Sequence, residues 1–475
     1  MRPNSPMTMV LPEQQVRDRV HQLVPELWST LGDLVRHRSI ATTPAPPLAD
    51  TAEVVAELFR AAGLRTAKVE TITHGGKTSA PMVVADEVAH TAVATVLLYA
   101  HYDVQPADAS KWTTKPFEPT EKMDENHDMR LYGRGAADDK SGVMMHLGAI
   151  KALLGDRGQL PLNIKLVIEG EEEAGSSVLE SYLAEHPDDP RFHADLVIVA
   201  DAGNVERGAP TLTETLRGIV AAEVTVETLA GKAHSGMFGG PVPDAFMALV
   251  QILATLQDRK TGDVAIAGLT QFDHAWPTVT EATYRRDAGV LPTTSLIGSG
   301  TIAKLLYGKP SVNVVGLSGL PLVSGSTNVL CPKAKARVSL RLAPNQDAGE
   351  AYAALEAHIM GAAPWGLKPV VKRIASGSGF VSVPGEHSDD IERALLEAYH
   401  ATSVARAGQG GSIPLVNALQ AANPESDIVL WGCEEPTTHA HGADESVSQS
   451  ELEHMTLAEA LLLRSVMSPI PIQPS

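Results

Sequence analysis

Cysteine, aromatic residues and long apolar runs are all scarce in this sequence. Its 475 residues include only two cysteines, Cys331 and Cys433, which lie far apart and outside any Cys-x-x-Cys spacing. A disulfide framework and a zinc site built from cysteines are therefore excluded. No stretch approaches the roughly 18 consecutive apolar residues of a transmembrane helix, so we expect no membrane span.

Positive charge is also in short supply. The chain has 38 Lys and Arg against 57 Asp and Glu, which gives a formal net charge of −19. This charge argues against a nucleic acid or an anionic membrane as partner, because both attract positive patches. Residues 1–20 lack the unbroken apolar stretch of a signal peptide, and we therefore expect a cytoplasmic protein.

The composition and length are those of a globular protein with more than one domain. Amphipathic helices are predicted at 16–37 and 49–63. Three short apolar runs, typical of buried strands, follow at 93–100, 162–170 and 194–201, and helices are predicted between and after them at 142–154 and 178–185. Strands that alternate with helices predict a mostly parallel α/β sheet covered by helices on both faces.

The pattern changes at residue 214, where strands begin to alternate between apolar and polar residues. Such strands are predicted at 218–229, 336–344 and 369–374, with helices at 244–256 and 347–358. They predict a smaller α+β domain, residues 214–382, inserted between the two parts of the first domain, residues 1–213 and 383–475. The second part resumes the earlier pattern, with helices at 388–401 and 449–467 and a strand at 427–432. The polar stretch 115–130 is predicted to be an exposed loop.

Imidazole and carboxylate groups follow the three apolar strands at the point where each strand ends. His101 and Asp103 end the first strand, Glu171–Glu173 the second and Asp201 the third. Because the carboxyl ends of parallel strands meet at one edge of a sheet, these groups are expected to lie together. Nitrogen and oxygen donors without thiolates suit zinc, manganese or cobalt.

Two further segments offer the same donor types. Asp138-Asp139 opens a helix after the turn-rich GRGAA, and His441 precedes the last helix. Each group alone has a plainer interpretation, since an Asp at a helix start is most often an N-cap and a lone His or a run of Glu is usually solvated. Their convergence at one sheet edge is what favours a metal site.

Six segments resemble one known family of proteins. These are LLYAHYDVQPAD, WTTKPFEP, LYGRGAADDKSG, IEGEEEAGS, GKAHSGMFGG and HGADES. They resemble the dinuclear metallopeptidases, a family that contains carnosinases, cytosolic dipeptidases, aminoacylases and glutamate carboxypeptidases. The resemblance runs from about residue 20 to 467 and looks closest to the carnosinase and cytosolic dipeptidase branch. It implies a catalytic α/β domain in two parts, with a ferredoxin-like lid and dimerisation domain inserted at 214–382.

The resemblance also implies a set of metal ligands. It pairs His101 with Asp201 on one ion and Glu173 with His441 on the other, with Asp138 as the bridge. Two divalent ions per subunit are implied, with zinc first and manganese or cobalt as alternatives.

Two more residues of this edge gain roles from the resemblance. Glu172 matches the general base and Asp103 the carboxylate that orients His101. The peptide bond between Asp138 and Asp139 is expected to be cis, as in relatives.

Substrate contacts are implied in the inserted domain and beside it. His234 matches a histidine that reaches across a homodimer into the neighbouring site, and Asn328 resembles a second substrate contact. Arg341 is suited to hold a carboxylate, although a salt-bridged surface arginine is the alternative. Gly411 and Ser412 open a predicted helix whose free N–H groups would bind an anion.

These features predict a metal-dependent dipeptidase that uses a metal-activated water and a Glu general base. Its substrate would be a small peptide, or an N-acyl amino acid, with a free carboxylate, and the protein is expected to form a homodimer through the lid. An aminoacylase, a carboxypeptidase or an N-acyl amino acid deacylase on the same scaffold is the alternative. A non-catalytic protein that binds metal or carboxylates is a third hypothesis, from another class.

Overall fold

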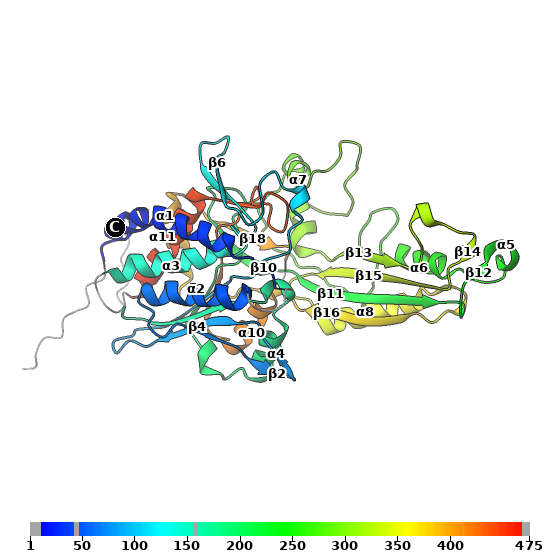
Figure 1. The fold of residues 1–475 in the computed structure, drawn as a ribbon, viewed down its shortest axis with the longest axis horizontal. Helices are drawn as coiled ribbons and strands as arrows, with labels where there is room; N and C mark the ends of the chain where they lie inside the picture. Colours follow the sequence, from blue (N-terminus) through cyan, green and yellow to red (C-terminus); the bar gives the residue numbers. More distant parts are fainter. Residues whose placement is uncertain (1–10, 42–46, 156–159, 412, 468–475) are drawn as a thin grey trace, which may run out of the picture. The chain divides into compact units, whose positions relative to one another are not determined.

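The computed structural model of the chain describes residues 11–41, 47–155, 160–411 and 413–467. The chain divides into two compact units (Figure 1). Unit 1 comprises Met1–Glu214, Ser382–Ala407 and Ile413–Ser475, and unit 2 comprises Thr215–Val381 and Gly408–Ser412. None of the described helices is long and apolar enough to cross a lipid bilayer.

Unit 1 is built on a six-stranded sheet. The strands in order across the sheet are β1 (Lys68–Glu70), β4 (Met82–Glu87), β8 (Asn163–Glu169), β5 (Thr95–His101), β9 (Leu196–Val199) and β19 (Asp427–Leu430). The last four run parallel, whereas β4 runs antiparallel to its neighbours β8 and β1. The predicted mostly parallel sheet is confirmed, and each strand predicted for it is present. The strands β1 and β4 were not predicted.

Both faces of this sheet are buried, which explains the unbroken apolar runs in its strands. In β5, Val96 and Leu98 belong to the large core cluster, while Leu97 and Tyr99 point to the opposite face and are fully buried as well. Successive side chains of a strand point to opposite faces, so a strand covered on both sides must be apolar at nearly every position.

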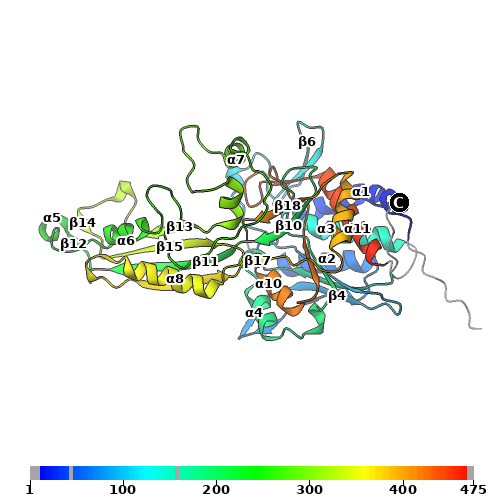
Figure 2. The ribbon, with the colours of Figure 1, turned by 180° about the vertical axis from the view of Figure 1, so that it is seen from behind.

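Five helices contribute to the same core cluster as one face of the sheet. They are α1 (Glu13–Arg36), α2 (Pro47–Ala61), α3 (Lys140–Leu154), α9 (Ser388–Tyr399) and α11 (Gln449–Val466). Helices α1, α3 and α11 contact one another and lie side by side in both views (Figures 1 and 2). Gly148 of α3 permits this close packing, because a Cβ there would lie only 2.6 Å from Thr456 and 2.7 Å from Leu27. Two further helices, α4 (Ser177–Glu185) and α10 (Pro414–Ala422), pack against each other.

The stretch predicted as an exposed loop at 115–130 instead contains one strand and the start of a second. Strands β6 (Thr120–Met123) and β7 (Met129–Tyr132) form a hairpin, and β7 also pairs with β20 (Ser446–Ser448). The loop prediction is therefore wrong for these residues. The stretch is polar, and β20, the strand that pairs with β7, is remote in the sequence. Arg130 of β7 and Ser446 of β20 are 316 residues apart. No local pattern could reveal that pairing.

Unit 2 contains a four-stranded antiparallel sheet with two helices. In chain order its elements are β11 (Gly218–Glu227), α6 (Ala245–Ala254), β13 (Ser311–Ser318), β15 (Lys333–Leu342), α8 (Ala348–Gly361) and β16 (Val370–Gly377). The strand order is β13-β15-β11-β16, and both helices pack against the sheet. This is the βαββαβ arrangement of ferredoxin-like folds, as the sequence predicted. Alternate residues such as Val338 and Leu340 face the helices and are buried.

The remaining elements are short. They are β2 (Thr73–His74), β3 (Lys77–Thr78), β10 (Thr211–Leu216), β12 (Ala233–His234), α5 (Ser235–Phe238), α7 (Glu281–Asp287), β14 (Val329–Leu330), β17 (Phe380–Val381) and β18 (Ala405–Gln409). The predicted helices and strands are otherwise present, with bounds shifted by a few residues, as is usual where element ends fray.

Candidate metal centre

The parallel strands of unit 1 bring three donor groups to one edge of the sheet. His101 is the last residue of β5, Glu172 lies in the short 3-10 turn that follows β8, and Asp201 lies just beyond β9. One donor atom from each of these three residues lies within 4.8 Å of the others. The expected convergence at the carboxyl ends of the strands is thus observed.

A second group of donors consists of Asp138, Glu173 and His441, again within 4.8 Å of one another. His441 Nε2 lies 2.9 Å from Asp138 Oδ2 and 3.1 Å from Glu173 Oε2. His101 Nε2, from the first group, lies 3.1 Å from Asp138 Oδ1. Asp138 therefore lies between the two groups and presents one carboxylate oxygen to each imidazole.

The peptide bond between Asp138 and Asp139 is cis, as expected. Asp139 lies directly before α3, and its Oδ2 accepts a hydrogen bond of 3.1 Å from the backbone N–H of His101. The two neighbouring aspartates thus contact the same histidine, one at its ring and the other at its backbone.

Asp103 contacts both His101 and the turn that carries the glutamates. His101 Nδ1 lies 3.1 Å from the backbone oxygen of Asp103 and 3.4 Å from its Oδ1. The Asp103 carboxylate accepts the backbone N–H groups of Glu172 at 3.2 Å and Glu173 at 3.0 Å. One buried carboxylate therefore holds the end of β5 and the turn after β8 together.

This environment tests whether the residues fit a metal ion. With Nδ1 of His101 facing oxygen acceptors, the ring proton belongs on Nδ1 and the lone pair on Nε2. Nε2 is buried, faces carboxylate oxygens and makes no hydrogen bond of acceptable geometry. A ring nitrogen placed among carboxylates needs a cation beside them, which is a second proton in the metal-free protein and a metal ion in the loaded one; a carboxylate or carbonyl behind the other nitrogen is the usual support of a histidine ligand. The residues therefore fit a metal.

The charges point the same way. Burial raises the pKa of Glu172 to about 8. The positive charge of His101 lowers this pKa, and the negative charges of Asp138 and Asp103 raise it further. Burial likewise raises the pKa of Asp201 well above its ordinary value, although His101 opposes it. Hydrogen bonds from the His441 imidazole to the carboxylates of Asp138 and Glu173 raise the pKa of His441 to about 11. So many carboxylates in one buried place repel one another unless positive charge compensates them.

Sequence reasoning missed several residues at this edge. Gln105 donates from its side chain to Glu173 Oε2 at 2.8 Å and from its backbone to Oε1 at 3.1 Å. Glu434 follows β19, the fourth parallel strand, and burial together with the charges of Asp138 and Glu445 raises its pKa to about 8. Its position after a parallel strand was the signal that could have revealed it.

Comparison with known proteins identifies the family. The sequence model described as peptidase family M20/M25/M40 matches residues 97–465. The chain belongs to this family. Cysteinylglycine-S-conjugate dipeptidase from Corynebacterium striatum is 35% identical to it over 443 residues, which cover 92% of this chain and 94% of the relative. Human Beta-Ala-His dipeptidase is 29% identical over 68% of this chain and 66% of its own.

Solved structures of similar proteins share the fold of this M20 peptidase. The di-peptidase Dug1p from Saccharomyces cerevisiae has a TM-score of 0.80 at 23% identity, and covers 97% of this chain and 100% of its own. Human carnosine dipeptidase 1 has a TM-score of 0.79 at 24% identity over 96% of this chain and 98% of its own. The prediction of a metal-dependent hydrolase of the dipeptidase type, in the branch of carnosinases and cytosolic dipeptidases, is confirmed.

The substrate residues predicted for the inserted domain lie in unit 2 of the M20 peptidase. His234 ends β12, where its Nδ1 accepts the N–H of Gly236 at 3.1 Å. The backbone oxygen of Asn328 accepts the N–H of Ser235 at 2.9 Å, so His234 and Asn328 are close neighbours along the β12–β14 pair. Gly411 is exposed, and Ser412 lies outside the described residues.

Arg341 has a neighbour that the sequence did not reveal. Arg341 has no acidic partner among the described residues, which disfavours the salt-bridged surface arginine. Arg217 is buried and donates to the backbone oxygens of Leu306 and Lys309 and to Ser311 Oγ, each at 2.8 Å. Burial and the nearby charge of Arg341 lower the pKa of Arg217 to about 10. Two guanidinium groups thus lie near each other in unit 2.

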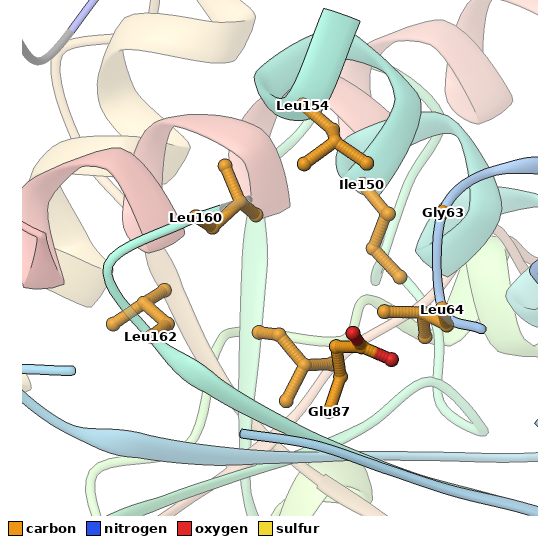
Figure 3. Close-up of a pocket in the computed structure, with 8 residues that line it drawn as sticks. Gly63, Leu64, Glu87, Ile150, Leu154, Leu160 and Leu162 are labelled. Carbon is orange, nitrogen blue, oxygen red and sulfur yellow. The ribbon is translucent and has the colours of Figure 1, made fainter. Parts of the chain in front are cut away.

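A small cavity elsewhere in unit 1 contains none of these residues. It has a volume of about 20 Å³, enough for one water molecule, and is lined mainly by aliphatic side chains such as Leu64, Ile150 and Leu162 (Figure 3). Glu87 is its one acidic lining residue. A lining of this kind offers no means of binding a metal or cleaving an amide.

Proposed function

We propose that this M20 peptidase is a two-metal dipeptidase that hydrolyses dipeptides with a free C-terminal carboxylate, with cysteinylglycine-type dipeptides as the first substrates to test. The observation that carries the proposal is the position of Asp138, whose two oxygens lie 3.1 Å and 2.9 Å from two different imidazoles. A bridging carboxylate of this kind is what two neighbouring divalent ions require. The substrate class follows the relative from Corynebacterium striatum, which is similar over nearly the whole chain.

The proposed ligands are those that the two donor groups supply. His101 and Asp201 would hold one ion, Glu173 and His441 the other, and Asp138 would bridge them. Zinc is the first candidate, with manganese or cobalt as alternatives, because all donors are nitrogen or oxygen. When bound, such a pair of ions lowers the pKa of a water and polarises the amide carbonyl.

Glu172 is the proposed general base. It belongs to the same donor group as His101 and Asp201, so its carboxylate is within reach of a water held there. It would take the proton of the attacking water and deliver it to the leaving amine, which contributes about 10²–10⁴-fold to the rate in enzymes that use such a base. Asp103 would keep the Glu172 backbone and the His101 ring in place through the contacts described above.

Binding of the substrate carboxylate is assigned to Arg341, with the N–H groups of Gly411 and Ser412 as further donors. The absence of an acidic partner for Arg341 among the described residues, and the proximity of Arg217, support this assignment. Positive charge without a counter-charge favours an anionic ligand. Asn328 is proposed as a second substrate contact.

His234 is proposed to act in the neighbouring subunit of a homodimer formed through unit 2, where it would polarise the scissile carbonyl. Exposed apolar side chains on unit 2 support an interface there, among them Val315 at 60%, Leu322 at 83% and Val323 at 92% exposure. Large exposed apolar side chains that gather on one domain are typical of interaction surfaces. Sedimentation should reveal a dimer, and full activity of a monomer at low concentration would contradict this part of the proposal.

The experiment that tests the function is a hydrolysis panel with metal-stripped and reloaded protein. Dipeptides, tripeptides and N-acyl amino acids would each be tried with zinc, manganese and cobalt. We expect cleavage of dipeptides only, abolished by stripping and restored by reloading. Cleavage of acylated amino acids with dipeptides left intact would move the assignment to an aminoacylase.

The Glu172→Gln variant is the control that separates an enzyme from a binding protein. It keeps the shape of the side chain and removes the base, so activity should fall about 10²–10⁴-fold while two ions stay bound. If the wild type and the variant were equally inert on every amide, a non-catalytic metal-binding protein would be the better interpretation. A cytoplasmic location also stays a prediction, which cell fractionation can check.

A further inference from the structure

The loop that carries His441 is unusual among the segments of the candidate metal centre. His441 is 56% exposed, whereas the side chain of His101 is fully buried. Three residues of the loop, His439, His441 and Asp444, have left-handed backbone conformations, with φ of 57°, 62° and 58°. Such conformations cost of order 1–3 kcal/mol each in residues other than glycine and persist only where surrounding contacts impose them. Something other than packing around the ring must hold His441 in place.

Arg134 provides one such contact. Its side chain is 3% exposed, and its Nη2 donates to the backbone oxygens of His441 at 2.9 Å and Gly442 at 3.0 Å. The guanidinium also lies over the ring of Trp112, 5.5 Å from the centroid. Arg134 therefore binds the backbone of the loop at the position of the ligand itself.

Glu445 continues this connection to the bridging aspartate. Its Oε2 accepts from Arg134 Nη1 at 2.5 Å, and its Oε1 accepts the backbone N–H groups of Ala137 at 3.1 Å and Asp138 at 3.3 Å. Its backbone oxygen accepts the N–H of Gly133 at 2.9 Å. One buried ion pair thus joins the backbone of Asp138 to that of His441, two residues whose side chains lie 2.9 Å apart.

We propose that Arg134 and Glu445 are positioning residues that fix one of the two metal subsites, the one formed by Asp138, Glu173 and His441. The proposal rests on the two-metal assignment given above. The pair reaches the other subsite only through the bridging Asp138, whereas His101 of that subsite is fixed within β5 and by Asp103 and Asp139. Loss of the pair should therefore weaken the binding of one ion and spare the other.

The chain contains a matched control for this inference. Arg130 and Glu435 form a second buried ion pair, with an Nη1–Oε1 distance of 2.6 Å and side chains 4% and 1% exposed. Arg130 lies on β7, four residues before Arg134, and donates to Ser446 through Nε and Nη2. Within the described residues, the hydrogen bonds and ion pair of its side chain go to Ser446 and Glu435 and to no residue of either donor group. Removal of Arg130 should cost stability without a selective effect on metal binding.

The test measures metal affinity rather than activity. Metal-free wild type, Arg134→Met, Glu445→Gln and Arg130→Met would be titrated with cobalt and with zinc against a chromophoric chelator. We expect two ions in the wild type and in Arg130→Met with the same affinities. In Arg134→Met one ion should bind about 10–100-fold more weakly, the usual effect of removing the support of a ligand, and the other should bind as in wild type. Glu445→Gln, which keeps an acceptor for the N–H of Asp138, should show a smaller loss at the same subsite.

The other possible results contradict either the positioning role of Arg134 and Glu445 or the two-metal assignment on which it rests. Wild-type affinity for both ions in Arg134→Met, an equal loss of both, or the same selective loss in Arg130→Met would overturn the proposal. If the wild type itself bound fewer than two ions, the two-metal assignment would fail instead. Circular dichroism and thermal melting establish whether each variant is folded. If Arg134→Met is not folded, the metal affinities of Arg134→Lys and Glu445→Gln test the proposal instead. Lysine keeps the charge but cannot donate to Glu445 and both carbonyls in the same plane, so it should show an intermediate loss.

Discussion

A buried, hydrogen-bonded pair of side chains between α3 and α11 offers a sharp test of the packing of unit 1. His146 Nδ1 lies 2.9 Å and 2.8 Å from the two carboxyl oxygens of Glu459, and its Nε2 lies 3.0 Å from the backbone oxygen of Tyr99. Both side chains are fully buried. Each ring nitrogen of His146 therefore has an oxygen partner inside the core, and the Glu459 carboxyl has the imidazole as its partner.

The magnitude follows from what each substitution leaves behind. His146→Leu leaves the Glu459 carboxyl buried without its hydrogen-bond partner, and Glu459→Met leaves Nδ1 of the imidazole without its partner. Leaving one buried polar group unsatisfied costs about 1–3 kcal/mol, whereas replacing both partners by apolar residues of similar shape can be nearly neutral. The carbonyl of Tyr99 loses the imidazole in the double variant, but it still accepts the N–H of Ala200 at 2.9 Å. That second hydrogen bond keeps the remaining cost small.

Urea unfolding of the wild type, both single variants and the double variant would measure these costs. We expect each single substitution to lower the free energy of unfolding by about 1–3 kcal/mol and the double substitution to cost less than the sum of the two. Costs that add within about 0.5 kcal/mol would mean that the two groups do not interact. Such additivity, or single variants as stable as the wild type, would refute the assignment of a buried hydrogen-bonded pair.

Two further perturbations test other parts of unit 1. Burial raises the pKa of Glu169 to about 8, so folding takes up a proton at this group, which should make the stability of the metal-free protein fall by at most about 1.4 kcal/mol per pH unit as pH rises from about 4.5 to 8. Glu169→Gln should remove this share of the fall and leave the share of Glu172 and Glu434, whose pKa values are raised to about 8 as well; the same pH dependence in both proteins would contradict the buried state of this carboxyl. Gly148→Ala should lower the melting temperature, because a Cβ would meet Thr456 at 2.6 Å and Leu27 at 2.7 Å. Overpacking costs about 1–3 kcal/mol, more than the gain of about 1 kcal/mol in helix propensity, and an unchanged or higher melting temperature would show that the helices move apart freely.

Much of the fold was predictable because its signals are local. The runs at 93–100, 162–170 and 194–201 are apolar at nearly every position, which only a strand buried on both faces requires. The alternation in 336–344 predicted a sheet with one face against helices, and Val338 and Leu340 are buried on that face. His101 and Asp201 could be predicted to lie at one edge of the sheet from the sequence alone, because parallel strands end on the same side.

The contacts that organise the candidate metal centre were not predictable in this way. Arg134 and Glu445 are 311 residues apart, and nothing in the sequence near either residue indicates the other. The same holds for β7 and β20, whose pairing turned an expected loop into a strand. Glu434, by contrast, follows the predicted strand at 427–432, so its position at this edge could have been inferred from the sequence.

The sequence by itself determined the four parallel strands, most of the helices and the donor groups at the ends of the strands, because burial and periodicity act over a few residues. Only the tertiary structure decided that Asp138 presents one oxygen to each imidazole, and that a buried ion pair ties its backbone to that of His441. Those distances depend on segments remote in the sequence, and their relative positions are set when the hydrophobic core excludes water and leaves each buried polar group to find a partner.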